Sequence, residues 1–248
     1  MINIKSDSDI EKMKVPNGIV RDFLCEVESK VKVGVSTYEI DKFAREFITK
    51  FGAVPSFLNY NGFPASICIS IDCEVVHGIP SKKKFIEEGQ IVSIDCGAYK
   101  NGYHGDAARS FLVGNCSDEK RQLVEVTKQS FFKGIEKAVV GNRLGDLSHA
   151  IGAHAESFGY GVVRELCGHG IGKKLHEDPE VLNYGTAGRG IRFSKGMVIA
   201  VEPMINMGTE KVEFFDDGWT CKTRDRLPSA HYENTIVITD GEPLILTL

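Results

Sequence analysis

Apolar residues recur at helical spacing near the start of the chain. From Ile10 to Val31 they repeat every three or four positions, which predicts an amphipathic helix. The spacing of Ser8 and Glu11 is that of an N-terminal capping box. Pro16 should bend this helix or delay its start, because proline removes a main-chain hydrogen bond.

A second capping box, Ser36 to Glu39, opens a clearer apolar stripe, and Gly52 is placed to end that helix. Residues 56–80 are rich in aromatic residues, Gly and Pro, and predict irregular, strand-like structure. The remaining predicted elements are strands over 91–98 and 103–113, helices over 118–140 and 146–158, and strands over 161–166, 197–201 and 231–239.

One pattern occurs twice. At a constant offset, the residues Gly34, Glu39, Ile40, Phe51 and Gly52 are matched by Gly141, Asp146, Leu147, Phe158 and Gly159. In each copy a long helix precedes the first Gly, a short helix follows it, and strands come after. We therefore predict an α+β fold in which an α-α-β unit is used twice, in a single domain over residues 1–248 with halves of approximately 1–113 and 114–248. Chance alignment of two amphipathic helices that end in Gly is the alternative.

Composition narrows the class of protein. Hydrophobic residues make up 42% and charged residues 26%, as is usual for a folded globular chain, and the formal net charge of -4 gives no reason to expect a nucleic-acid partner. The seven Cys never form a CxxC pair, so neither a disulfide framework nor a thiolate zinc site is indicated. With no signal peptide and no membrane span, we expect a cytoplasmic protein.

Two carboxylates lie on a predicted hairpin. Asn101-Gly102 is the signature of a two-residue turn, and pairing across it places Gly97 opposite Asp106 and Asp95 opposite Ala108. The two Asp residues then share one sheet face as diagonal neighbours, roughly 7–8 Å apart. Without a cation, repulsion would push one carboxyl group towards protonation. Two solvent-facing Asp residues, common on antiparallel sheets, are the ordinary alternative.

A glycine-rich segment, residues 167–179, carries two histidines. Three alternating glycines keep the backbone open around His169. The segment has no Walker pattern, so it is a poor candidate for a phosphate-binding loop. Seven positions separate His169 from His176, which in a continuous strand would place them on opposite faces. The chain must therefore bend between them if both serve one site.

Two further carboxylates stand at the ends of apolar strands. Glu202 follows residues 197–201 and precedes Pro203, and Glu233 begins the strand that runs to Ile238. A lone Glu at the end of a strand is usually solvated, whereas a buried one needs a partner. Four carboxylates and one imidazole suit a pair of divalent ions such as Mn, Fe, Co or Zn, whose charges they would balance.

Taken together, these motifs resemble those of the type I methionine aminopeptidases over almost the whole chain. The matching stretches are His77-Gly78-Ile79-Pro80, Ile94-Asp95, 102–106, 167–172, His176-Glu177, Glu202-Pro203-Met204, 217–219 and Tyr232-Glu233. The resemblance implies the pita-bread fold, two α-β halves related by a pseudo-twofold axis. It also implies a monomer with two divalent metal ions (Co, Mn, Fe or Zn) that removes the initiator methionine from proteins and peptides with a small second residue.

The resemblance implies a role for each ligand. Asp106 and Glu233 bridge both metal ions, Asp95 serves one, and His169 and Glu202 serve the other. Glu202 is also the expected general base.

The resemblance further implies a catalytic pair of histidines and a methionine pocket. His176 would stabilise the tetrahedral intermediate, and His77 would contact the scissile peptide near its nitrogen. The residues implied to bind substrate are Phe57, Tyr60, Phe63, Cys68, His77, Leu175, His176 and Trp219. Aromatic edges and sulfur suit a thioether.

Three features leave details open. Phe57 replaces a residue that is often small, and Asn234 stands where His is usual after the metal-binding Glu, so the pocket volume and the surroundings of the metal ions are open. Lys82-Lys83-Lys84 predicts a solvated loop, with a ribosomal RNA contact as the alternative.

Two other functions compete with the main hypothesis. A proline-specific peptidase, similar to aminopeptidase P or prolidase, has the same fold and the same five ligand types, but usually carries a sizeable extra N-terminal domain. Pita-bread proteins without catalysis serve as binding modules and typically lose metal ligands, whereas all five are present here. A type II methionine aminopeptidase would need a helical insertion between Glu202 and Glu233, for which there is no room.

Overall fold

The computed structural model describes residues 2–248. Its helices are α1 (Asp7–Val27), α2 (Thr37–Lys50), α3 (Asp118–Ile135) and α4 (Leu144–Ser157), with short 3-10 turns η1 (Glu28–Lys30) and η2 (Tyr60–Gly62). Its strands are β1 (Val54–Pro55), β2 (Ile67–Ile71), β3 (Glu74–Val76), β4 (Ile91–Lys100), β5 (Tyr103–Leu112), β6 (Gly161–Val162), β7 (Gly168–Gly170), β8 (Glu177–Val181), β9 (Val198–Val201), β10 (Met204–Asn206), β11 (Val212–Phe214), β12 (Cys221–Thr223), β13 (Ser229–His231), β14 (Glu233–Val237) and β15 (Leu244–Ile245).

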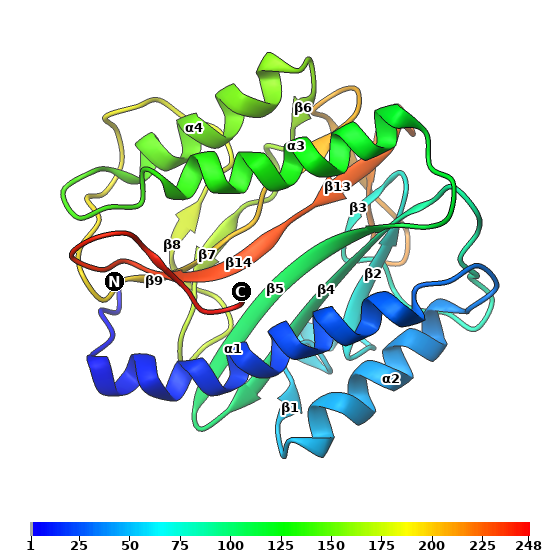
Figure 1. Cartoon of the computed structure of the whole chain (residues 1–248), viewed down its shortest axis with the longest axis horizontal. Coiled ribbons are helices and arrows are strands. Elements are labelled where there is room, and N and C mark those ends of the chain that lie inside the picture. The colour runs from blue at the N-terminus through cyan, green and yellow to red at the C-terminus, as the bar shows by residue number, and fades with distance from the viewer. Residues whose placement is uncertain (1) are drawn as a thin grey trace.

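A large sheet joins the two ends of the sequence. Its strand order is β1-β4-β5-β14-β9-β7-β8, with β2 added beside β4 and β15 beside β14. Strand β14, from the end of the chain, lies between β5 and β9 and pairs with both in antiparallel fashion. In Figure 1 the long strands β4, β5 and β14 run through the middle of the molecule. The centre of the sheet therefore collects residues from both halves of the sequence.

Each pair of helices covers its own part of the sheet. Figure 1 shows α1 and α2 along one edge of the molecule and α3 and α4 along the opposite edge. Buried residues of α1 and α2 form one core with β2, β4 and β5, and those of α3 and α4 form another with β9 and β14. The helices cover the apolar faces of these strands. The polar side chains of the strands are therefore on the face of the sheet that the helices leave uncovered.

The predicted repetition is visible in the second helix of each pair. Helices α2 and α4 have 14 residues each and begin and end at the corresponding positions of the repeated pattern. Gly34 and Gly141 precede these helices and Gly52 and Gly159 follow them, all four with positive φ. Isolated bridges at the equivalent residues Ser36 and Arg143 complete the likeness. The division of the chain near residue 113 stays a prediction.

The predicted start of the first helix is wrong. The N-cap is Ser6, whose hydroxyl accepts from the amide of Asp9 while the Asp9 carboxylate accepts from the amide of Ser6, so the capping box lies two residues earlier than Ser8. Pro16 does not delay the helix either, because α1 runs through it without a break. The second capping box, Ser36 with Glu39, is confirmed.

Several other predicted boundaries also move. Helix α3 ends at Ile135 rather than near residue 140, and the strand predicted over 161–166 keeps only its first two residues. The strand predicted over 231–239 is divided into β13 and β14 at Tyr232. Within residues 2–248, no helix is long and apolar enough to cross a membrane.

Candidate metal centre and active site

The β4–β5 hairpin forms the floor of the site. Asn101 and Gly102 both have positive φ, as the predicted two-residue turn requires, and Asp95 faces Ala108 while Gly97 faces Asp106. The predicted register is therefore confirmed. One oxygen of each Asp is buried without a hydrogen-bond partner. Burial raises the pKa of Asp95 to about 7, and burial together with the charges of neighbouring carboxylates raises that of Asp106 well above its usual value.

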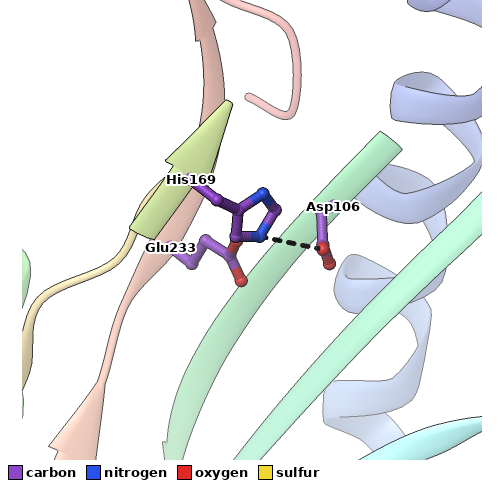
Figure 2. A group of neighbouring side chains, drawn as sticks. All are labelled: Asp106, His169 and Glu233. Atoms are coloured by element: carbon purple, nitrogen blue, oxygen red, sulfur yellow. Dashed lines mark ion pairs between the residues drawn. The ribbon is translucent and has the colours of Figure 1, made fainter. Parts of the chain in front are cut away.

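Strands from the second half of the chain complete the cluster. Glu233 at the start of β14 pairs with Ala108, and His169 in β7 pairs with Ala200 of β9. Glu202 follows the last residue of β9. Each of these elements thus turns one polar group towards the hairpin, and Figure 2 shows His169 and Glu233 beside Asp106 of β5. Ligand atoms of these three residues lie within 4.8 Å of one another.

The tautomer of His169 indicates what the cluster binds. Its Nδ1 lies 2.9 Å from the carbonyl oxygen of Gly170, which can only accept, so Nδ1 carries the proton and Nε2 has a lone pair. Nε2 lies 3.9 Å from Asp106 and 3.8 Å from Glu202. Burial lowers the pKa of His169 to about 3, which keeps the ring neutral. A lone pair that faces two carboxylates needs a cation between them, so these residues fit divalent metal ions.

The charge of the cluster leads to the same conclusion. Burial raises the pKa of Glu202 and of Glu233 well above the usual value, and mutual repulsion adds to it. The part-buried cation Arg109 donates to the main-chain oxygen of Glu233 at 2.6 Å rather than to its carboxylate. Four carboxylates in one buried site are therefore left without protein partners that match their charge.

His77 and His176, the two histidines with expected catalytic roles, lie at the edge of the carboxylate cluster. Residues 171–176 form a loop between β7 and β8, so the predicted bend is present and the rings of His169 and His176 lie 4.3 Å apart. The Nδ1 atom of His176 lies 3.0 Å from the hydroxyl of Tyr60. His77 adopts a positive φ of 58° after β3, and burial followed by the charge of His176 lowers its pKa to about 4.

An apolar pocket opens onto the carboxylates. A cavity of about 140 Å³ is lined by the five expected ligands, by His77 and His176, and by Phe57, Tyr60, Asn61, Phe63, Cys68, Leu175 and Trp219. The ring of Trp219 meets that of Phe63 edge to face at 5.1 Å. Burial, then the charge of Asp95, raises the pKa of the Cys68 thiol, so the pocket presents a neutral sulfur. The structure thus brings every expected site residue to one place.

Comparison with known proteins agrees with this geometry. The model of metallopeptidase family M24 matches residues 11–240. The chain belongs to family M24. A methionine aminopeptidase of Clostridium acetobutylicum is 56% identical over 100% of this chain and 99% of its own length. The crystal structure of a methionine aminopeptidase from Thermotoga maritima superposes with a TM-score of 0.98 at 42% identity, covering 100% of this chain and 99% of that one.

A more distant solved structure has the same fold. Prolidase from Pyrococcus furiosus superposes with a TM-score of 0.80 at 24% identity, covering 99% of this chain and 65% of that one. This likeness shows the common fold alone. The M24 chain described here has the pita-bread architecture, and the predicted α+β class is confirmed.

His231 is a site residue that the sequence analysis did not find. It is 1% exposed, and its Nε2 lies 3.7 Å from Glu202 without a hydrogen-bond partner. Burial, then the charges of His77 and Arg109, lowers its pKa to about 3. It precedes Glu233 by two residues, the strand period that places side chains on one face, and this spacing was the available signal. Asn61, in the pocket wall, gave no comparable signal.

Asn234, the residue after Glu233, is held by Arg109 and by the C-terminal end of the chain. The side-chain oxygen of Asn234 accepts from Arg109 at 2.7 Å and from the hydroxyl of Thr247 at 2.9 Å. Arg109 also donates to the main-chain oxygens of Ala108 and Thr247. The part-buried guanidinium of Arg109 therefore links the start of β14, which carries Glu233, to Thr247.

The loop with three lysines is only partly solvated. Lys82 and Lys83 are exposed, whereas the ammonium of Lys84 forms an ion pair with Glu74 and is half-buried. The expectation that all three lysines face solvent is wrong for Lys84, because Glu74 at the start of β3 lies within its reach.

Proposed function

We propose that this chain removes the initiator methionine from new proteins and peptides whose second residue is small. One observation carries the proposal: the pocket of aromatic residues and sulfur opens directly onto the carboxylate cluster, within a single cavity. A side chain of methionine size in that pocket would place its own carbonyl beside the cluster. The M24 relatives named methionine aminopeptidase support this substrate class.

The site would hold two divalent cations, with Asp95, Asp106, His169, Glu202 and Glu233 as ligands. The number follows from charge, since four carboxylates balance two such ions. The ligand set suits Mn, Fe, Co and Zn alike, so the sequence and fold do not select among them. When bound, such ions lower the pKa of water and polarise a peptide carbonyl.

Glu202 is the proposed general base. It stands at the junction of the methionine pocket with a larger groove of about 950 Å³, which would carry the rest of the peptide. Glu202 would take a proton from the attacking water and deliver it to the leaving amine. His77, which lines both cavities, would contact the scissile peptide near its nitrogen.

His176 is the proposed donor to the oxyanion. If the hydroxyl of Tyr60 donates to Nδ1 of His176, the ring proton sits on Nε2, the only other polar atom of the ring. Burial lowers the pKa of His176, which favours this neutral form. Nε2–H would then donate to the oxygen that gains negative charge when water attacks the carbonyl.

A peptide panel tests the function. Met-Gly and Met-Ala peptides should be cleaved much faster than Met-Leu and Met-Lys peptides, with metal content measured on the same samples. Equal rates on Met-Leu and Met-Ala would refute the specificity. Cleavage of Xaa-Pro peptides instead would establish a proline-specific peptidase, and bound metal without any cleavage would establish a binding module.

The proposed setting follows from the substrate. Initiator methionine is removed from chains emerging from the ribosome, so we propose a cytoplasmic enzyme. The resemblance to type I methionine aminopeptidases is our reason for proposing a monomer. The exposed Lys82 and Lys83 would contact ribosomal RNA. Cosedimentation with ribosomes at low and high salt, compared between the parent and a Lys82→Ala/Lys83→Ala variant, tests the contact. Sedimentation of the protein alone tests the monomer.

A further inference from the structure

The segment before α1 packs against the loop that carries His176. The amide of Lys5 donates to the carbonyl of Gly196 at 2.8 Å, which fixes the segment on the body of the molecule. From there, the Lys5 ammonium reaches Glu177, the residue after His176, at 2.6 Å. The side-chain amide of Asn3 donates to the same carboxylate oxygen at 3.1 Å.

This ion pair differs from those on the surface of the protein. The side chains of Lys5 and Glu177 are 6% and 5% exposed, whereas those of Lys14 and Glu11 are 48% and 67% exposed. An exposed pair contributes little, because water and salt screen it. A buried carboxylate that loses its cation is left uncompensated, and the local structure must change to hydrate it.

Glu177 in turn organises the loop. Its second oxygen accepts from the amide of Lys174 at 3.2 Å, and the amide of Gly172 donates to the carbonyl of Lys174 at 3.1 Å. A Cβ at Gly172 would lie 2.6 Å from the end of the Lys5 side chain and 2.7 Å from the Glu177 carboxylate, so any side chain there would displace the ion pair. The ion pair is thus packed directly against the turn from which His176 projects.

We propose that Lys5 is a positioning residue: through its buried ion pair with Glu177 it holds the 172–177 loop so that His176 stays between Tyr60 and His169. The inference rests on the oxyanion role proposed for His176. The contacts at the two ends of the loop support it, because His176 is restrained on one side by Tyr60 and on the other by its neighbour Glu177. The N-terminal segment then forms part of the active site, although it contacts no expected ligand.

Lys5→Met tests the proposal, because it keeps the length of the side chain and removes the charge. A catalytic group displaced by about 1 Å can cost about 10²-fold in rate. We expect kcat to fall by about that factor and both metal ions still to bind in calorimetry; because Lys5 also lines the larger groove, any change in KM should be by a smaller factor than the change in kcat. Lys120→Met is the matched control, since Lys120 forms a part-buried pair with Asp72 at 2.7 Å away from both cavities, and kcat should be unaffected.

A second readout separates positioning from general stability. In ¹⁵N spectra of histidine-labelled protein, the ring signals of His176 should shift in Lys5→Met while those of His149, on α4, stay in place. The double variant Lys5→Met/Glu177→Gln removes the stranded charge and should recover part of the lost kcat. If Lys5→Met does not fold, Asn3→Ala, which removes one donor from Glu177, should give a smaller fall in kcat of the same kind.

The outcomes separate the two hypotheses. If His176→Ala keeps the parent kcat, the proposed role of His176 is wrong. If His176→Ala loses activity while Lys5→Met keeps it, the positioning role of Lys5 is wrong. Loss of a metal ion in Lys5→Met, an equal fall in Lys120→Met, or unmoved His176 signals would also overturn the inference.

Discussion

Replacing Asp95 by Asn should stabilise the protein once its metal ions are removed. Asp95 and Asp106 are diagonal neighbours on one face of the hairpin, and each has a buried oxygen that lacks a hydrogen-bond partner. Ionising Asp95 in this place therefore costs free energy in the folded chain. The neutral amide of Asn has nearly the same shape and avoids that cost.

The size and pH dependence follow from the pKa of Asp95, which burial raises from 3.8 to about 7. A group with a raised pKa contributes stability that is fully present below its unfolded value and is lost as pH rises through the folded value. Each pKa unit corresponds to about 1.4 kcal/mol. At pH 8 Asp95→Asn should therefore raise the free energy of unfolding by about 4 kcal/mol, and at pH 5 by only about 2 kcal/mol.

Urea unfolding of chelator-treated protein at both pH values measures this difference. Because the charge of Asp95 also raises the pKa of Asp106, Glu202 and Glu233, the comparison measures the removal of one charge from the whole carboxylate cluster. Asp216→Asn, at an exposed carboxylate, is the control and should change stability little at either pH. An Asp95→Asn variant that is less stable than the parent at pH 8, or equally stabilised at both pH values, would refute the electrostatic account.

Three further predictions address the chemistry and specificity. His176→Ala should lose about 10²–10³ in kcat and keep both metal ions, whereas His169→Ala should lose affinity for one ion; calorimetry beside steady-state kinetics decides, and the reverse pattern would exchange the roles. Trp219→Ala opens one wall of the pocket and should raise KM for Met-Ala peptides; an unchanged KM would remove Trp219 from the pocket. The protein's own second residue, Ile2, is bulky, so intact mass should show that Met1, which lies outside the described residues, is retained; a native chain beginning at Ile2 would contradict the specificity.

Local signals in the sequence predicted the hairpin well. Asn101-Gly102 fixes the turn, the turn fixes the register, and the register places Asp95 and Asp106 on one face. Nothing in this chain of inference depends on distant parts of the fold. The ligands Glu202 and Glu233 were harder to derive, because whether a strand-end carboxylate is buried depends on which strands pair with it.

Two other features could not be predicted from local sequence: the start of the first helix, for which two capping boxes compete, and the ion pair of Lys5. Ser8 with Glu11 matches the usual capping pattern better than Ser6 with Asp9, yet the helix begins at the earlier pair, where the Asp9 carboxylate also accepts from Tyr103 at 2.6 Å. Such a contact across 94 residues has no local signature. The same holds for the Lys5 ion pair.

The interleaved order of the central strands has a consequence for biosynthesis. Strand β14 lies between β5 and β9. The β4–β5 hairpin is synthesised long before β14, so the carboxylate cluster cannot be completed until β14 has been made. Thr247, which follows Asn234 by 13 positions, binds Arg109 through its main-chain oxygen and Asn234 through its hydroxyl. A ribosome stalled before this point carries a chain that cannot assemble its metal centre. Each molecule must therefore have β14 and Thr247 outside the ribosome before it can process its first substrate.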